Sequence, residues 1–331
     1  MRWVLLLLLL FSGTSCSPAR DSSETTFMMG TFVEIMIRDF KGPDNIISGA
    51  LGTIKDVEGT FNLYDEKSEL SKINKSSDPE IKVSEDLFRL LQLSKEINAL
   101  TNGMFDITLG PVQALWGFYG PEKRVVPSKD DISKELAKTG FDKIELNHDR
   151  TVKFKIKGMK LDMNAVSKGY AVDKGIAYLI SKGVKNAIIN AGGDVYCLGD
   201  NDGKGWIVGL RDPVDKSEII ATLNTSNRSI ATSGGYENFF TLDGQAYQHI
   251  IDPATGEPVR NDVLSATAIA GKAALADGLA TAFSILDPEE SLSVADSIKG
   301  IDCVIICRDK DEYSYYISRD IVNDLKVIGR R

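Results

Sequence analysis

The strongest constraint on this fold is a helix that begins at Asn164 and has an extended segment on each side. Residues 161–163 are apolar at alternate positions, which is typical of a strand, and the apolar run 187–189 predicts a second strand after the helix. A helix start has backbone amides without internal partners, and Lys168 adds a cation one turn later. The helix start is therefore predicted to bind an anion.

Two consecutive glycines, Gly192 and Gly193, follow the second strand. Because glycine has no Cβ, backbone N–H groups at such a turn can approach a second anionic oxygen. Neither the helix start nor the glycine turn is specific alone. Together they indicate a phosphate-bearing ligand and suggest a nucleotide.

Predicted strands come in runs rather than in strict alternation with helices, which indicates an α+β protein with mostly antiparallel sheets and packed helices. The first strand is not followed by GxGxxG, and GxxxxGK[ST] is absent, which argues against Rossmann and P-loop folds. Helices are predicted at 46–61, at 84–101, from Asn164 onward and at 272–286. Strands are predicted at 31–37, 143–146, 152–156, 161–163, 187–189, 206–209, 219–223, 229–232, 239–241, 303–307 and 313–317.

The composition is that of a globular protein, with 331 residues, 43% of them apolar, 26% charged, and a net charge of −8. This length allows one large domain or two. Lysines and arginines are scattered and form no basic stripe that could neutralise phosphates. The sequence therefore predicts no binding to nucleic acid.

Residues 1–15 predict a bacterial lipoprotein signal peptide. Arg2 precedes an apolar run too short to span a bilayer, and small residues stand directly before Cys16. We expect a lipidated Cys16, a polar tether at 16–26 and a folded domain at 27–331, held in the periplasm at the inner membrane, with the outer membrane left open. The alternative, an ordinary secretory signal with an incidental cysteine, also exports the protein.

Three cysteines remain after Cys16, and an odd number cannot pair completely within one chain. Cys303 and Cys307 lie four residues apart in a predicted strand, so they share a face but are too far apart to bridge easily. We interpret Cys303 and Cys307 as small buried apolar residues, and no disulfide framework is expected. With two histidines in the chain, a structural zinc site is not expected.

Several segments, in this order along the chain, resemble the ApbE family, which comprises FAD:protein FMN transferases and related FAD pyrophosphatases. They span almost the whole chain after the signal peptide. One difference is Gly235, which stands where the family usually has aspartate. The segments are MGT (29–31), YDEKSELSKIN (64–74), GMFDITLGPVQALWGF (103–118), LDMNAVSKGYAVD (161–173), NAGGD (190–194), SGGYENFF (233–240), HIIDPATGEP (249–258) and ADGLATA (276–282).

The resemblance implies a two-lobed catalytic domain with the ligand in a cleft between the lobes. It also implies FAD as substrate, Mg2+ as cofactor and, as partner, a target protein that accepts FMN on a threonine or serine with release of AMP. Attack by water would instead hydrolyse FAD to FMN and AMP. The alternatives from other classes are a non-catalytic periplasmic flavin-binding lipoprotein and a binding protein for another nucleotide.

Asp277 and Thr281 are the candidate metal ligands among side chains. Residues four apart share a helix face, and oxygen ligands of this kind suit magnesium. Spacing alone favours a different interpretation, in which Asp277 caps or pairs near its helix start and Thr281 bonds back to a helix carbonyl. The resemblance favours the metal and adds the backbone carbonyl of Ala165.

The flavin ring requires an aromatic and apolar wall. Trp116, Gly117 and Phe118 are the candidates for ring contact, and burial of the two aromatic rings as ordinary core is an equally weighted alternative. Tyr64 lies in a charged loop, where simple burial is less expected. Adding the positions that the resemblance implies and the glycine turn, the predicted flavin-binding residues are Met29, Tyr64, Trp116, Gly117, Phe118, Asp162, Lys168, Gly192, Gly193 and Ile251.

His249 and Lys168 are the predicted catalytic residues. His249 precedes a predicted turn at 252–256, and a lone histidine is usually structural, here a strut for the loop. The resemblance places it near the bond that changes, so we expect it to move a proton to or from the incoming oxygen. Lys168 would stabilise the charge that builds on the leaving AMP. His148, among polar residues, is interpreted as part of a solvated turn.

Overall fold

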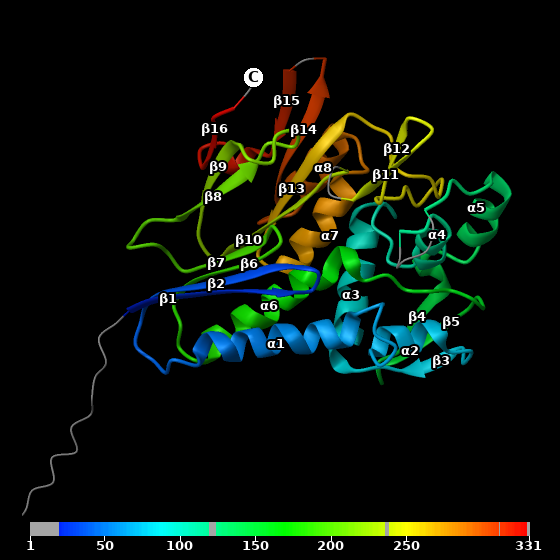
Figure 1. Ribbon diagram of the computed structural model, residues 1–331, viewed down its shortest axis with the longest axis horizontal. Helices are drawn as coiled ribbons and strands as arrows, with labels where there is room; N and C mark the ends of the chain where they lie inside the picture. Colours follow the sequence, from blue (N-terminus) through cyan, green and yellow to red (C-terminus); the bar gives the residue numbers. More distant parts are fainter. Residues whose placement is uncertain (1–19, 119–123, 236–237, 311, 330–331) are drawn as a thin grey trace, which may run out of the picture.

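The computed structural model describes residues 20–118, 124–235, 238–310 and 312–329. Its centre is an eight-stranded sheet in which each strand is antiparallel to its neighbours (Figure 1). The strands, in spatial order, are β1 (Arg20–Met28), β2 (Thr31–Phe40), β6 (Asn186–Ala191), β7 (Asp194–Leu198), β10 (Arg228–Ser233), β13 (Val263–Ala270), β14 (Asp302–Asp309) and β15 (Glu312–Ile317).

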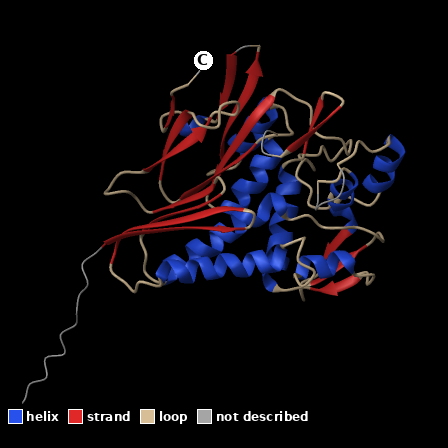
Figure 2. Ribbon diagram, in the orientation of Figure 1, coloured by secondary structure: helices blue, strands red, loops and turns tan. Residues whose placement is uncertain are grey.

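Long helices cover one face of this sheet (Figures 1 and 2). They are α1 (Ile46–Phe61), α3 (Glu85–Leu100), α6 (Asn164–Ser181) and α7 (Ala273–Phe283). Alternate residues of β2 point into this layer, where Ile35 is fully buried and packs in one cluster with Ile54 of α1 and Val172 of α6. This period of two is what a strand with one face on the core requires.

The second half of the sheet is buried on both faces. In β14, Cys303, Ile305 and Cys307 pack into the helical core, whereas Val304 and Ile306 pack into a second core. A three-stranded sheet provides the other side of that core, formed by β8 (Trp206–Arg211), β9 (Ile219–Thr225) and β16 (Leu325–Val327). The predictions that Cys303 and Cys307 share a face and are buried are confirmed, and Cys197 is likewise free and buried.

The remaining elements are two small sheets and several short helices. The sheets are β3 (Glu80–Lys82) with β5 (Thr151–Phe154) and β4 (Ile144–Leu146), and the hairpin of β11 (Phe239–Leu242) and β12 (Gln245–Gln248). The short helices are α2 (Glu69–Lys75), α4 (Gly110–Leu115), α5 (Lys129–Leu136), α8 (Pro288–Ser297) and the 3-10 turns η1 (Phe141–Lys143) and η2 (Arg319–Ile321). Of these, α8 and η2 pack against β14. The α+β prediction is confirmed, while the two-lobed division stays a prediction.

Two sequence predictions differ from the structure. Residues 161–163 form no strand, because Leu161 is held by the side chain of Asn74, which accepts from its N–H and donates to its carbonyl, both at 2.8 Å. Most of the predicted tether is strand β1, which pairs with β2 along its length. An edge strand with polar, largely exposed side chains carries no alternating apolar signal.

The predicted signal peptide and Cys16 lie outside the described residues. Within the described part of the chain, no helix is both long enough and apolar enough to cross a membrane.

Candidate active site

A cavity of about 650 Å³ opens among the β1–β2 turn, the start of α6, the loop around Tyr64, α7 and the segment after β12. This volume is in the range of small-molecule sites. The residues predicted from sequence that line it are Met29, Tyr64, Phe118, Asp162, Ala165, Lys168, Gly192, His249, Ile251, Asp277 and Thr281.

Two features of α6 hold α7 against it. A Cβ on Gly169 would lie 2.3 Å from the carbonyl oxygen of Ala273, so glycine is required for the close approach of the helices. Asp173 then caps α7, because its two carboxylate oxygens accept the backbone N–H groups of Ala273 at 2.7 Å and Ala274 at 3.0 Å. Burial raises the pKa of Asp173 to about 6 in spite of these bonds.

Lys168 stands between two buried carboxylates that come from different elements. Its Nζ lies 3.0 Å from Asp194 Oδ2, at the start of β7, and 3.4 Å from Asp277 Oδ1, on α7. The second oxygen of Asp277 accepts the backbone N–H of Gly169 at 3.1 Å. Of the predicted alternative roles, Asp277 does not cap its own helix, since Asp173 takes that role, but it does form an ion pair, with Lys168.

Lys168, Asp194 and Asp277 form a charge cluster, and the protonation of each group in it follows from burial and from the neighbouring charges. Burial raises the pKa of Asp194 to about 7, Asp277 adds to this shift, and Lys168 opposes it. Burial alone would lower the pKa of the Lys168 ammonium, but the two carboxylates outweigh burial and raise it above its ordinary value. Lys168 therefore stays charged at neutral pH.

Thr281 makes the back-bond to a helix carbonyl that was predicted as the alternative to a role as metal ligand. Its Oγ1 donates to the backbone carbonyl of Asp277 at 3.3 Å, which is the predicted back-bond, and lies 3.4 Å from Ser233 Oγ at the end of β10. Both Thr281 and Ala165 still line the cavity beside Asp277. Among the described residues, no group of three or more His, Cys, Asp or Glu side chains is arranged to hold a metal.

The glycine turn has a different task from the predicted one. The N–H of Gly192 donates to Phe32 O at 3.1 Å, and the N–H of Gly193 donates to Asn190 Oδ1 at 3.0 Å. Both glycines have positive φ, and a Cβ on Gly192 would lie 2.4 Å from Thr31 Oγ1. The glycines therefore let β6 turn into β7 beneath the β1–β2 turn, which brings Asp194 to Lys168.

One of the backbone amides at the start of α6 also already has a hydrogen-bond partner within the chain. The N–H of Asn164, one of the amides predicted to meet an anion, donates to Asp162 Oδ1 at 2.9 Å. Opposite it, Met29 and Gly30 form the two-residue turn between β1 and β2, and both have positive φ, which suits a hairpin. Glu58 of α1 accepts the Met29 N–H at 2.7 Å and holds this turn at the cavity.

The structure separates the three residues proposed for ring contact. Phe118 lines the cavity, whereas Trp116 and Gly117 do not. Trp116 is 2% exposed, packs against Tyr247 and donates its indole N–H to Gly256 O at 2.8 Å, so the core alternative holds for this residue. Tyr64 lines the cavity and is 63% exposed, as its charged loop predicts.

His249 follows β12 at the cavity wall, and its ring Nδ1 lies 3.0 Å from Asn238 O, so the loop-strut role and the cavity position coexist. Gly235, which differs from the family pattern, lies against the side chain of Gln248. A Cβ on Gly235 would lie 2.1 Å from Gln248 Oε1, and the Gln248 amide donates to Val259 O at 2.7 Å. Gln248 occupies the space that a larger residue at 235 would need.

Among the cavity residues that were not selected from sequence, three carry polar side chains that matter for the site: Asp106, Gln113 and Asp194. Asp194 ends the NAGGD segment and Asp106 lies in the FDIT segment, where burial raises the pKa of its carboxyl. Both lie in segments in which other residues were chosen as site candidates. For Asp194, a carboxylate directly after a glycine turn is a signal that could have identified it. Gln113 stands in the same 103–118 segment as Asp106, but its side chain carries no signal of its own, and the packing of α4 brings it to the cavity.

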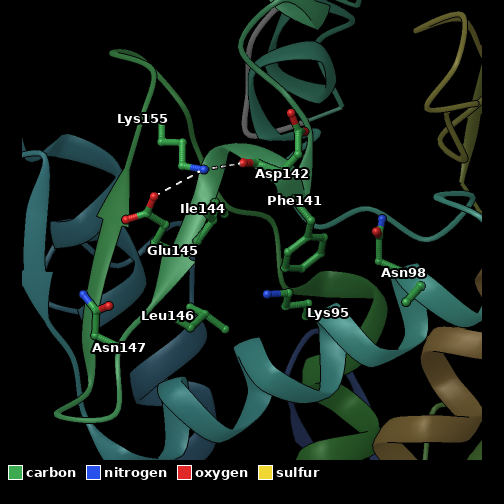
Figure 3. Close-up of a pocket in the computed structure, with 10 residues that line it drawn as sticks. Lys95, Asn98, Phe141, Asp142, Ile144, Glu145, Leu146, Asn147 and Lys155 are labelled. Atoms are coloured by element: carbon green, nitrogen blue, oxygen red, sulfur yellow. Dashed lines mark hydrogen bonds and ion pairs between the residues drawn. The ribbon is translucent and has the colours of Figure 1, made fainter.

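A second hollow, of about 510 Å³, lies between α3 and the sheet of β4 and β5 (Figure 3). Lys155 crosses it to Glu145 Oε1 at 3.3 Å and to Asp142 O at 3.0 Å. Predicted site residues do not line it. It is lined by Lys95, Asn98, Ala99, Phe141, Asp142, Ile144, Glu145, Leu146, Asn147 and Lys155.

Comparisons with known proteins agree in family. The chain is 34% identical over 271 residues to the FAD:protein FMN transferase of Vibrio cholerae, covering 80% of each chain. It is 32% identical over 266 residues to the enzyme of that name from Escherichia coli K12, covering 78% of this chain and 75% of the other. The solved structure of flavin transferase ApbE from V. cholerae superimposes with a TM-score of 0.84 at 30% identity, over 93% of this chain and 100% of the other.

The ApbE family pattern matches residues 29–305, from the β1–β2 turn to β14. This match contains the turn at Met29, the charge cluster and the His249 segment, and so includes the residues that meet at the cavity. The chain therefore belongs to the ApbE family.

Proposed function

We propose that this protein is a flavin transferase that cleaves FAD and transfers FMN to a threonine or serine of a target protein, with release of AMP. The names of its relatives support this activity. The observation that carries the proposal is the convergence of Lys168, Asp194, Asp277 and His249 on one cavity from four separate segments. A protein that only bound flavin would not need two buried carboxylates beside a lysine, whose burial costs free energy.

The residues have distinct tasks in this reaction. His249 accepts the proton of the incoming hydroxyl, whose oxygen attacks the phosphorus on the FMN side of the P–O–P link. The bond between this phosphorus and the bridging oxygen breaks, and the bridging oxygen leaves with AMP. The ammonium of Lys168 stabilises the negative charge that develops on the leaving AMP. Phe118, Tyr64 and Ile251 provide apolar and aromatic surface for the flavin. If water enters in place of the hydroxyl, the same steps hydrolyse FAD to FMN and AMP.

The donor set fits a magnesium ion. With both carboxylates ionised, the Lys168 cluster carries one excess negative charge, which repels a diphosphate. Asp194 Oδ2 is buried and, within the described part of the chain, has an ion pair but no well-formed hydrogen bond. Asp277, Thr281 and the carbonyl of Ala165 would hold the ion, with Asp194 close by. When bound, Mg2+ would neutralise phosphate charge and make the P–O–P link more electrophilic.

We also propose that the protein acts outside the cytoplasm as a lipid-anchored periplasmic protein at the inner membrane. The apolar run before Cys16 and the small residues that precede this cysteine support the anchor. Mass spectrometry of the membrane-bound protein would find a lipidated Cys16 at the N-terminus. An unmodified protein that is released into the periplasm would contradict the anchor and leave the enzymatic proposal standing.

The activity is tested by incubating the purified protein with FAD and Mg2+, with and without a threonine-containing acceptor peptide, and resolving FMN, AMP and FMN-peptide. We expect AMP in both reactions and FMN-peptide when the acceptor is present, with loss of all products after chelation. Stoichiometric FAD binding without any AMP would favour the non-catalytic flavin-binding alternative.

A further inference from the structure

We propose that Arg124 and Gln113 are positioning residues that hold His249 in one tautomer and one place, with the backbone carbonyl of Asn238 as the contact that sets the tautomer. This inference rests on the proposed function, in which His249 accepts the proton of the incoming hydroxyl. It concerns side chains outside the charge cluster, from a loop and a short helix.

The carbonyl of Asn238 receives two contacts from His249. The backbone N–H of His249 donates to it at 2.9 Å, and the ring Nδ1 lies 3.0 Å from the same oxygen. A carbonyl oxygen has no hydrogen to give, so Nδ1 must carry the ring proton. In the neutral imidazole, the lone pair that can accept a proton is then on Nε2.

Asn238 needs support because it lies one residue beyond the paired part of the β11–β12 hairpin, whose last pair is Phe239 with Gln248. Arg124 supplies that support. Its Nη1 donates to Phe239 O at 2.8 Å, its Nη2 donates to Asn238 Oδ1 at 3.0 Å, and its guanidinium lies 5.9 Å from the centre of the Phe240 ring. One planar fork therefore holds three consecutive residues.

Gln113 holds the other side of the His249 backbone. It lies on α4, lines the same cavity, and donates its side-chain amide to His249 O at 3.0 Å. The N–H of His249 is thus held through the hairpin and its carbonyl through α4, two elements that are separate in the sequence. General-base catalysis depends on such placement, because small displacements from the reacting oxygen lower the rate steeply.

The tautomer can be observed directly by nitrogen-15 NMR of histidine-labelled protein. The chain has two histidines, and His148→Gln removes the exposed one, which leaves a single ring to assign. We expect the neutral ring of His249 to be protonated at Nδ1, and we expect Arg124→Ala to give a mixture of tautomers. A neutral ring protonated at Nε2 in the otherwise native protein would overturn the inference, whatever the activity.

The kinetic test compares Arg124→Ala with Arg260→Ala. Arg260 is a matched control, because its guanidinium lies over Tyr247 of the same hairpin, at 5.7 Å. We expect Arg124→Ala to lower kcat for FMN transfer by roughly tenfold to a hundredfold with KM for FAD unchanged, and Arg260→Ala to leave both constants near wild type. Arg124→Lys keeps the charge but not the fork, and should recover only part of kcat.

Gln113→Glu tests the second contact, since a carboxylate of the same shape cannot donate to His249 O. We expect it to lower kcat in the same direction as Arg124→Ala. Equal losses in the Arg124→Ala and Arg260→Ala proteins, or losses confined to KM for FAD, would show that Arg124 serves hairpin stability alone. If wild-type protein yields neither AMP nor FMN-peptide, the proposed function fails, whereas the NMR result still decides the tautomer.

Discussion

At the scale of single residues, the site depends on side chains that have two tasks at once. Asp277 pairs with Lys168 through one carboxylate oxygen and holds the Gly169 N–H with the other. Removing the whole carboxylate would leave that buried N–H without a partner, at a cost of about 1–3 kcal/mol. A useful variant must therefore remove the negative charge of Asp277 and keep its hydrogen bond with the Gly169 N–H.

Asp277→Asn makes that separation, because the amide oxygen can still accept the Gly169 N–H while the negative charge is lost. We expect this variant to unfold at nearly the wild-type temperature and to lose Mg2+-dependent FAD cleavage, since it no longer offers a carboxylate to the ion. Calorimetry and AMP release measure the two properties. Full turnover of Asp277→Asn in Mg2+ would remove Asp277 from the metal site.

His249→Ala should affect the two proposed reactions, FMN transfer and FAD hydrolysis, to different extents. Loss of a general base lowers turnover by about a hundredfold to ten-thousandfold, and FAD affinity should change little because the charge cluster remains. Transfer should suffer more than hydrolysis, because a bound Mg2+ would help to activate water, which enters the cavity more easily than a protein hydroxyl does. Free FMN and FMN-peptide are compared at saturating FAD. Equal loss of both products would return His249 to a structural role.

At the scale of elements, the contact of α6 with α7 decides where the charge cluster lies. The spacing of Asp277 and Thr281 predicted a shared helix face, and the structure has that face. The spacing did not predict the roles of Asp173 and Gly169. Asp173 caps α7 and Gly169 allows the close approach of α7, and both contacts join residues about a hundred positions apart.

Gly169→Ala is expected to force the two helices apart. The added Cβ would lie 2.3 Å from a backbone carbonyl, which cannot move as a side chain does. We expect a loss of about 3 kcal/mol in the free energy of unfolding, at the upper end for overpacking, and a parallel loss of FAD cleavage. Gly52→Ala, at an exposed position of α1, is the control, where no atom lies within 4 Å and a gain of about 0.5–1 kcal/mol is expected. Urea unfolding that ranks both variants alike would contradict the contact.

The cap of α7 predicts a pH dependence of stability. The pKa of Asp173 is raised from 3.8 to about 6 in the folded state, so between these values the folded state holds a proton that the unfolded state has lost. The free energy of unfolding must therefore fall as pH rises from about 4 to about 6. Subtracting the values for Asp173→Asn isolates this effect, which we expect to be about 2–3 kcal/mol. A difference that rises with pH would mean that the cap lowers the pKa instead.

At the scale of the whole molecule, strand β1 links residue 20, the first described residue, to the cavity. It pairs with β2 up to the turn at Met29 and Gly30, and this turn lines the cavity. Residues 20–28 are therefore part of the folded domain.

A protein that begins at residue 29 should accordingly bind FAD more weakly than one that begins at residue 20. Without β1, Met29 becomes a mobile end and is no longer fixed against Glu58, whereas the longer protein keeps the hairpin. We expect a higher KM for FAD in the shorter protein and wild-type constants in the longer one. The same KM in both would show that β1 contributes nothing to the site.

The sequence by itself determined the α+β class, the long helices and most of the central strands, because these depend on local periodicity of apolar residues. Most residues that line the cavity also fall within the segments whose order resembles one family. Only the tertiary structure decided the roles of Asp194, Trp116 and the glycine turn. Those roles depend on which distant groups arrive at each side chain, such as Gly256 at the indole of Trp116 and Lys168 at Asp194. Such long-range contacts leave no periodic signal along the chain.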